Sequence, residues 1–244
     1  MGVHEAPPLL YKKESTNPLQ SDAVYGCDVM NLLYAIISCA AVYRCMRRDP
    51  PASVKHEAFS WLDEWYKVHE FERLNIKLIY VFDGHELNLK RTRRALCRAL
   101  KRRLQARLAA STTWQEYDKV TAKLTRVNGQ LVKAFCDWVR ARFRPGTYCL
   151  LGAPFEADAQ LAYLEMHGYT QGTLSPDSDI YFYEGSRNLY SGFNTRSKRK
   201  YRSVINRASV DPYFASLKGE ALRSLSCFMG TDYIDHLRGV GWFD

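Results

Sequence analysis

Short runs of strand-forming residues, separated by segments of helical periodicity, limit the folds open to this chain more than any other feature. The runs cover residues 23–27, 77–82, 147–151 and 171–175, and helical patterns cover residues 29–43, 54–74 and 155–167. Parallel strands must be joined by long crossovers, which are usually helices. The alternation therefore predicts an α/β fold, with a mostly parallel central sheet and helices on both faces.

Acidic residues follow all four predicted strands. They are Asp28, Asp83, the pair Glu156 and Asp158, and the pair Asp177 and Asp179. In open α/β sheets the ligand crevice lies outside the carboxyl ends of the strands. We therefore expect these carboxylates, although distant in sequence, to meet at one edge of the sheet.

The stretch LSPDSDIYFY, residues 174–183, places Asp177 and Asp179 where an extended segment is expected to begin. In extended backbone, residues i and i+2 point to the same face. Two carboxylates about 4 Å apart repel by ~4 kcal/mol at an effective dielectric constant near 20. Water, a basic side chain, a shared proton or a divalent cation could offset this repulsion.

Each acidic residue also has an explanation that involves no ligand. Asp28 and Asp83 suit helix N-caps, and Glu156 and Asp158 suit the first turn of a helix after Pro154. Both members of the latter pair can reach one site only at the helix entrance, because positions i and i+2 diverge by about 200° inside a helix. Capping explains the whole set less well. Because the set contains only oxygen ligands, it suits Mg²⁺ or Mn²⁺ and not zinc.

The composition narrows the class of partner. A formal net charge of +9 favours a polyanion, either nucleic acid or an acidic membrane surface. The 7 cysteines form no CxxC pair, which favours free thiols in a reducing compartment. The most apolar segment, residues 29–43, is shorter than the ~20 residues of a membrane span and starts too far into the chain for a secretory signal. We expect no membrane partner and see no targeting segment.

Four motifs resemble the flap endonuclease/XPG family of structure-specific 5′ nucleases in order and spacing. They are VFDG (81–84), GAPFEADAQLAYL (152–164), SPDSDIYFY (175–183) and FMGTDYIDHLRGVG (228–241). The resemblance runs over most of the chain from Tyr25 onward. It implies a PIN/flap-endonuclease-like fold with a basic helical arch, and a phosphodiesterase that acts on DNA with a 5′ flap, branch or end.

The resemblance also implies a two-ion Mg²⁺ site, in which Mn²⁺ can substitute. Asp28, Asp83, Glu156 and Asp158 would hold one ion, and Asp177, Asp179 and Asp232 would hold the second. Asp235 is similar to a further carboxylate of phage and bacterial members. Asp158 stands where many relatives carry Glu, a change that keeps the charge.

Residues 90–107, KRTRRALCRALKRRLQAR, contain 9 Lys or Arg and no acid. Such a run is often only a solvated face, but here it directly follows Asp83-Gly84. The resemblance makes it the arch that a single strand passes, with Lys90 polarising the scissile phosphate. Cys97 occupies the position of the family's companion arginine, so we expect Arg94 and Arg98 to replace it. The nucleic-acid contacts expected from this run are Lys90, Arg91, Arg93, Arg94, Arg98, Lys101 and Arg102.

Three further features have both a structural and a functional interpretation. Tyr34 is either a core aromatic or, by the resemblance, a stacking platform for a base. Lys198, Arg199 and Lys200 belong to a basic run at 195–202 that we expect on an exposed hairpin, where it could contact duplex phosphates or act as a nuclear signal. Gly239 and Gly241 resemble the turn of a helix–two-turn–helix element that grips duplex DNA, often through K⁺.

Only three residues follow Gly241, so this sequence has no room for the second helix of that element. Either the chain is a fragment of a longer protein or the duplex anchor is reduced, and we expect a fragment. No sliding-clamp motif is visible. We expect an N-terminal arm at 1–22 and one nuclease domain at 23–244. Its parts are an N-terminal region at 23–84, the arch at 85–146, and an internal region with the start of the helix–two-turn–helix at 147–244.

Three alternatives to a DNA nuclease stay open. One is a nuclease of the same fold that acts on RNA, and another is a non-catalytic scaffold that binds nucleic acid or protein. The third is a glycosyltransferase that uses Asp177 and Asp179 to hold a metal–nucleotide sugar, although the basic run has no role there. For the nuclease we expect an intracellular, nuclear location.

Overall fold

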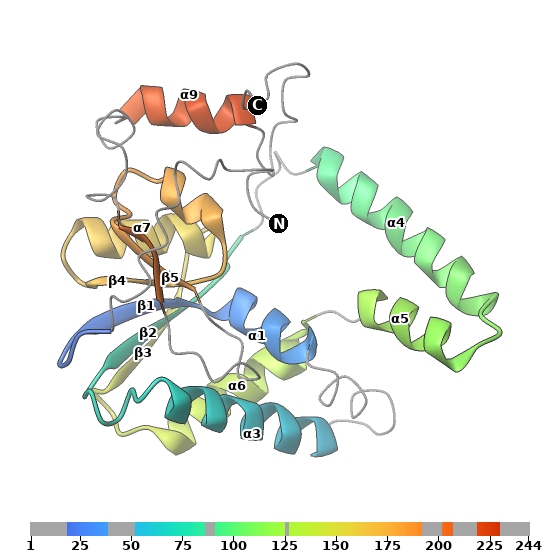
Figure 1. Ribbon diagram of the computed structural model, residues 1–244, viewed down its shortest axis with the longest axis horizontal. Helices are drawn as coiled ribbons and strands as arrows, with labels where there is room; N and C mark the ends of the chain where they lie inside the picture. The colour runs from blue at the N-terminus through green and yellow to red at the C-terminus, as the bar shows by residue number, and fades with distance from the viewer. Residues whose placement is uncertain are drawn as a thin grey trace.

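A computed structural model describes residues 19–38, 52–85, 91–124, 127–191, 202–206 and 219–229. Its centre is a six-stranded sheet of order β3-β2-β1-β4-β5-β6 (Figure 1). The strands are β1 Val24–Asp28, β2 Lys77–Phe82, β3 Tyr148–Gly152, β4 Gly172–Leu174, β5 Asn188–Ser191 and β6 Arg202–Asn206. The first five are parallel and β6 pairs antiparallel with β5. The predicted α/β fold class is confirmed.

The strand order reverses at β1. The chain builds outward from β1 through β2 to β3, and then returns to the other side of β1 to form β4 and β5. Gly26 of β1 pairs with Ile79 of β2 on one side and with Thr173 of β4 on the other. In doubly wound sheets such a switch point, at the carboxyl ends of the strands, is where ligands bind.

Helices cover both faces of the sheet (Figure 1). The helical elements are α1 Val29–Ser38, α3 Ala52–Val68, α4 Arg91–Ala109, α5 Trp114–Leu124, α6 Gly129–Arg142, α7 Ala157–Met166, the 3₁₀ helix η3 Ser178–Phe182 and α9 Gly219–Met229. Buried residues of α1, α3 and α6 form the main core with alternate strand residues such as Tyr25 and Tyr80. Helix α7 packs on the opposite face, where a Cβ on Gly26 would lie 2.5 Å from Leu161 Cδ2.

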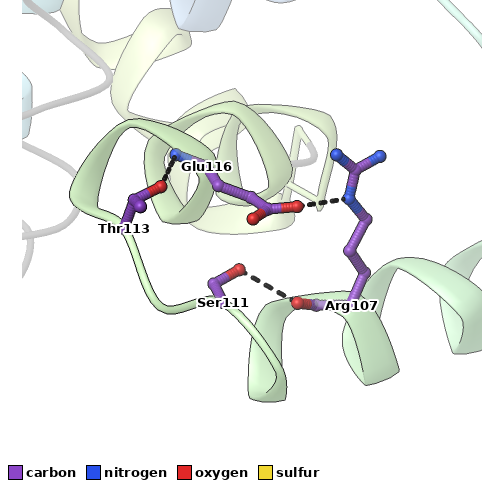
Figure 2. Close-up of polar contacts among 4 residues, drawn as sticks. All are labelled: Arg107, Ser111, Thr113 and Glu116. Atoms are coloured by element: carbon purple, nitrogen blue, oxygen red, sulfur yellow. Dashed lines mark hydrogen bonds and ion pairs between the residues drawn. The ribbon is translucent and has the colours of Figure 1, made fainter.

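Helices α4 and α5 pack against each other and stand apart from the sheet (Figure 1). The turn between them is closed by polar contacts, which Figure 2 shows. Arg107 Nε lies 2.9 Å from Glu116 Oε1, and the Ser111 hydroxyl donates to the Arg107 carbonyl at 2.9 Å. Thr113 Oγ1 accepts a bond from the Glu116 amide at 3.3 Å, which caps the start of α5.

The predicted element boundaries are mostly close, and the largest errors have local causes. Helix α3 ends at Val68, not at 74, because the chain turns with positive φ at Glu70 and Asn75. The strand expected at the fourth run is only β4, and the segment after it is the 3₁₀ helix η3 and not extended backbone. The hairpin expected around 195–202 is consistent with the antiparallel pairing of β5 and β6, but residues 192–201 lie outside the described part.

Two further findings concern the described residues alone. None of their helices is both long and apolar enough to cross a membrane. The five cysteines among them, Cys27, Cys97, Cys136, Cys149 and Cys227, are free thiols.

Candidate metal centre

Asp28 ends β1 and is almost fully buried, with 4% of its surface exposed. Its Oδ1 accepts a bond from the Asn31 amide at 3.0 Å, so Asp28 does cap helix α1, as the alternative explanation for this residue proposed. Its Oδ2 accepts a second bond from Asn31 Nδ2 at 2.5 Å. Asn31 therefore fixes the orientation of both carboxylate oxygens.

Asp83, directly after β2, caps a helix that is distant in sequence. Its Oδ1 accepts a bond from the amide of Ala157, the first residue of α7, at 2.8 Å. The Gly84 amide donates to the Phe155 carbonyl at 2.6 Å, and the His85 amide to the Pro154 carbonyl at 3.0 Å. The loops after β2 and β3 are therefore joined at the point where their acidic residues lie.

The close approach of the loops after β2 and β3 requires glycine at position 84. A Cβ at Gly84 would lie 1.9 Å from the Ala153 carbonyl oxygen and 2.7 Å from that of Pro154. Because both obstacles are backbone atoms, the two loops could not stay together with a larger residue at this position. The glycine of the VFDG motif therefore allows the loop that carries Asp83 to lie against the loop that carries Glu156.

Glu156 and Asp158 occupy the entrance of α7, where both can reach one site. Glu156 is the N-cap residue with extended backbone, φ −90° and ψ 141°, and its side chain makes no capping bond. Asp158 lies in the first turn, and its Oδ1 is buried without a hydrogen-bond partner in the structure. A capping bond therefore explains neither side chain, although Asp158 lies in the first turn, where an acidic residue favours the helix dipole.

Asp177 and Asp179 are close for a reason that differs from the one expected. The prediction of extended backbone was wrong. Asp177 is the N-cap of η3, with φ −83° and ψ 121°, and its Oδ1 accepts a bond from the Asp179 amide at 3.1 Å. An Asp side chain that bonds the backbone two residues on favours a tight turn over a strand.

Ser175 connects this turn to β1. Its hydroxyl oxygen accepts bonds from the Asp177 amide at 3.1 Å and from Asn31 Nδ2 at 3.3 Å. Asn31 thus contacts both Asp28 and Ser175, and the ends of β1 and β4 are held together at the switch point.

The carboxylates lie close enough to affect one another's pKa. Burial, and then the charges of Asp83 and Asp177, raise the pKa of Asp28 to about 7, against the lowering effect of the Asn31 bonds. Burial raises the pKa of Asp158 well above its ordinary value, and the neighbouring charges add to this rise. Those neighbours are Asp28, Asp177, Asp179 and Asp83.

Tyr183, at the end of η3, belongs to the same environment. Its phenol pKa is raised by burial first and then by nearby carboxylates, those of Asp158, Glu156, Asp179 and Asp177. We use the name acidic cluster for the six carboxylates at this edge of the sheet, which are Asp28, Asp83, Glu156, Asp158, Asp177 and Asp179. Tyr183 is a neighbour of the cluster and not a member.

The acidic cluster suits a divalent cation chemically. Its donors are all carboxylate oxygens, the ligands of Mg²⁺ and Mn²⁺, and the buried Asp158 Oδ1 has a free acceptor site. Within the ranges that the structure describes, no three acidic, histidine or cysteine side chains are arranged so that they could hold one ion as they stand. Asp232 and Asp235, the remaining predicted ligands, lie outside those ranges.

The predicted nucleic-acid contacts that the structure describes lie on helices α1 and α4, and the remaining ones are outside the described part. Tyr34, on α1, is 41% exposed and so is not a core aromatic. Arg98, Lys101 and Arg102 are exposed on α4, and none of them is among the groups that shift the pKa of Asp28 or Asp158. Arg91, Arg93 and Arg94 begin α4, but their side chains are outside the described part, as are the whole residues Lys90, Lys198, Arg199, Lys200, Gly239 and Gly241.

Sequence reasoning missed Asn31, Ser175 and Tyr183. Asn31 had a usable signal, because it stands three residues after a predicted N-cap, where the chain contacts the capping side chain. Ser175 and Tyr183 had none, since only the pairing of β4 with β1 and the turn of η3 bring them to the acidic cluster.

A parallel sheet that collects carboxylates from four strand ends at its switch point defines a PIN/flap-nuclease-like fold. Solved structures agree. The catalytic core of Rad2 in complex with a DNA substrate superposes with a TM-score of 0.62 at 20% identity, covering 98% of this chain and 65% of that one. Flap endonuclease-1 from Methanococcus jannaschii gives a TM-score of 0.58 at 20% identity, covering 92% and 71%.

Sequence relatives are consistent with this fold. A family model described as the XPG I-region matches residues 149–232. DNA damage-inducible protein DIN7 of Saccharomyces cerevisiae is 30% identical over 177 residues, covering 70% of this chain and 40% of that protein. Flap endonuclease 1 of Archaeoglobus fulgidus is 26% identical over 228 residues, covering 88% and 65%.

The chain belongs to the flap endonuclease/XPG family, as its motifs indicated. It spans less than two thirds of the length of the first curated relatives that it matches, 40%, 31% and 65% of them.

Proposed function

We propose that this protein is a divalent-metal-dependent 5′ nuclease that hydrolyses phosphodiester bonds in flapped, branched or 5′-ended DNA. The observation that carries the proposal is the acidic cluster, in which burial and mutual repulsion raise the pKa of Asp28 and Asp158. The names of relatives, among them flap endonuclease and exodeoxyribonuclease, support DNA as the substrate. A nuclear location fits that substrate and is part of the proposal.

Each residue has a role in this proposal. Asp28, Asp83, Glu156 and Asp158 would hold one Mg²⁺, and Asp177 and Asp179 would hold a second with Asp232 and Asp235. Bound divalent ions supply acidification of a water molecule and neutralisation of charge on the departing oxygen. Asn31 orients Asp28, and Lys90 and Arg94 would neutralise the phosphate that reacts, while Arg98, which is exposed on α4, would attract the strand.

The proposal is tested by incubating the protein with 5′-flap, nicked, blunt-ended and RNA substrates, with Mg²⁺ or with EDTA. We expect Mg²⁺-dependent release of a short 5′ product from the flapped or 5′-ended DNA. Cleavage of RNA alone would show that the substrate is RNA and not DNA. Binding without any cleavage would instead support a non-catalytic scaffold.

Asp177→Asn tests the metal assignment separately. The substitution removes a ligand charge and keeps the side-chain oxygen that accepts the Asp179 amide. We expect turnover to fall at least ~100-fold while DNA binding is largely retained, because the basic residues of α4 are unchanged. Unchanged cleavage by this variant would contradict the assignment.

A further inference from the structure

Phe155 is an exposed aromatic residue within the acidic cluster's own loop. It lies between Pro154 and Glu156, and 51% of its surface is exposed. Single exposed apolar residues are normal on protein surfaces, so exposure alone shows nothing. The surroundings of this residue give the exposure a meaning.

The backbone around Phe155 is held from both sides. The Gly84 amide donates to its carbonyl at 2.6 Å, and the His85 amide donates to the Pro154 carbonyl at 3.0 Å. On the other side the Ala157 amide donates to Asp83 Oδ1 at 2.8 Å. Phe155 is therefore fixed to the loop that carries Asp83, and it directly precedes the helix that carries Asp158.

We propose that the Phe155 ring packs against a nucleobase of the strand whose phosphate is held at the acidic cluster. This inference rests on the proposed function. An aromatic ring without a polar group recognises the π-face of a base, so the contact would tolerate any sequence. The carboxylates repel phosphates, whereas the uncharged face of a base can approach the ring without that penalty.

A phosphate held at the carboxylates leaves its own nucleotides beside Phe155. Phe155 is adjacent in sequence to Glu156, and consecutive Cα atoms are about 3.8 Å apart. The contact would therefore involve a base next to the reacting phosphate and would act on binding more than on the chemical step.

Phe155→Ala should weaken binding of single-stranded and 5′-flap DNA about 5- to 150-fold, the range of one base–aromatic contact, and raise KM more than it lowers kcat. Phe155→Trp should restore binding. Tyr163→Ala is the matched control, because Tyr163 is 49% exposed on α7, about 9 Å along the helix from its first residue, Ala157. The midpoints of thermal unfolding should not change, since the Phe155 ring is exposed.

An abasic scan identifies the base. One nucleotide at a time along the strand is replaced by an abasic residue, and binding is measured for the unmodified protein and for Phe155→Ala. At one position next to the cleaved bond, the loss caused by the missing base and the loss caused by Phe155→Ala should not add, because both remove the same contact. For Tyr163→Ala the abasic loss should be unchanged at every position.

The outcomes separate the two proposals. If the unmodified protein binds and cleaves DNA but Phe155→Ala does the same with equal KM, the base contact is overturned and the nuclease function stands. Fully additive losses at all positions would overturn it as well. If the unmodified protein neither binds nor cleaves any of these substrates, both proposals fail together.

Discussion

At the scale of single residues, the acidic cluster affects the stability of the fold in two opposite ways. Capping bonds stabilise it, whereas burial and repulsion of the carboxylates destabilise it. Asp28, Asp83 and Asp177 each accept a backbone amide and thereby cap a helix or turn. Asp158 contributes no such bond, and its buried Oδ1 has no partner. Among the carboxylates of the acidic cluster, Asp158 is therefore the one whose ionised form should cost the fold most.

Asp158→Asn should stabilise the metal-free protein. Because the folded-state pKa of Asp158 is raised, its contribution to stability is complete below the ordinary value of 3.8 and is lost as the pH rises through the raised value. At about pH 8 in EDTA, we expect the free energy of unfolding of Asp158→Asn to be about 1–3 kcal/mol higher than that of the unmodified protein. Near pH 4 the two proteins should have the same free energy of unfolding. Denaturant titrations across this pH range measure the difference.

Glu64→Gln is the control, because Glu64 is an exposed carboxylate on α3. It should change the unfolding free energy by less than about 0.5 kcal/mol. Added Mg²⁺ should stabilise the unmodified protein more than Asp158→Asn, since the proposed ion would bind the folded state through this carboxylate. Equal stabilities in EDTA at every pH would refute the electrostatic assignment.

At the scale of elements, the sequence predicted what periodicity and strand-end chemistry determine. Strand β2 has the predicted bounds, and the six carboxylates of the acidic cluster lie at the predicted edge. The extended backbone expected after Asp177 was wrong, because side-chain bonding to the Asp179 amide outweighed the strand preference of Ile180, Tyr181 and Phe182. The parallel strand β5 was not predicted, since its four residues carry too little pattern.

Gly84→Ala tests the junction between the loops after β2 and β3. Its Cβ would lie 1.9 Å from a backbone oxygen, so the loops must separate and the bond from Ala157 to Asp83 must lengthen. We expect a loss of about 1–3 kcal/mol in unfolding free energy and at least a ~10-fold loss of cleavage. Gly152→Ala, at the end of β3 with nothing within 4 Å of its Cβ, should change neither measurably.

The pair of helices α4 and α5 has a small core of its own. Leu104 is 8% exposed and Val120 is 2% exposed, yet neither belongs to the main core under the sheet. The Arg107–Glu116 pair at the turn is solvent-exposed, at 59% and 36%, and is worth at most about 1 kcal/mol. Helices α4 and α5 are therefore stabilised mainly by the apolar residues packed between them, and not by the main core under the sheet.

Val120→Asn should loosen α4 and α5 without unfolding the domain. Burying an amide at this position removes apolar packing and leaves polar atoms without partners. Hydrogen exchange should accelerate at least ~10-fold across 91–124 and stay unchanged in β1 and β2. Lys119→Asn, at the exposed neighbouring position, should leave both regions unchanged, and equal acceleration throughout would show one cooperative unit.

At the scale of the whole molecule, acidic and basic residues are concentrated in different places. The formal net charge is +9, while the carboxyl edge of the sheet carries the acidic cluster. A polyanion must therefore be attracted by basic residues that lie away from the carboxylates. Arg98, Lys101 and Arg102 suit this role, because they are exposed on α4 at helical spacing that places them on one face.

The salt dependence of binding distinguishes a localised contact from net charge alone. Replacing Arg98, Lys101 and Arg102 by Gln lowers the formal charge from +9 to +6. If each contacts one phosphate of a single strand, the slope of log K against log salt concentration should become less steep by about 2. Replacing Lys67, Lys77 and Arg144 by Gln makes the same charge change at exposed positions near the amino ends of β2 and β3, and should leave the slope almost unchanged. Equal slopes for the two triple variants would mean that the charge of the molecule, and not the face of α4, attracts the strand.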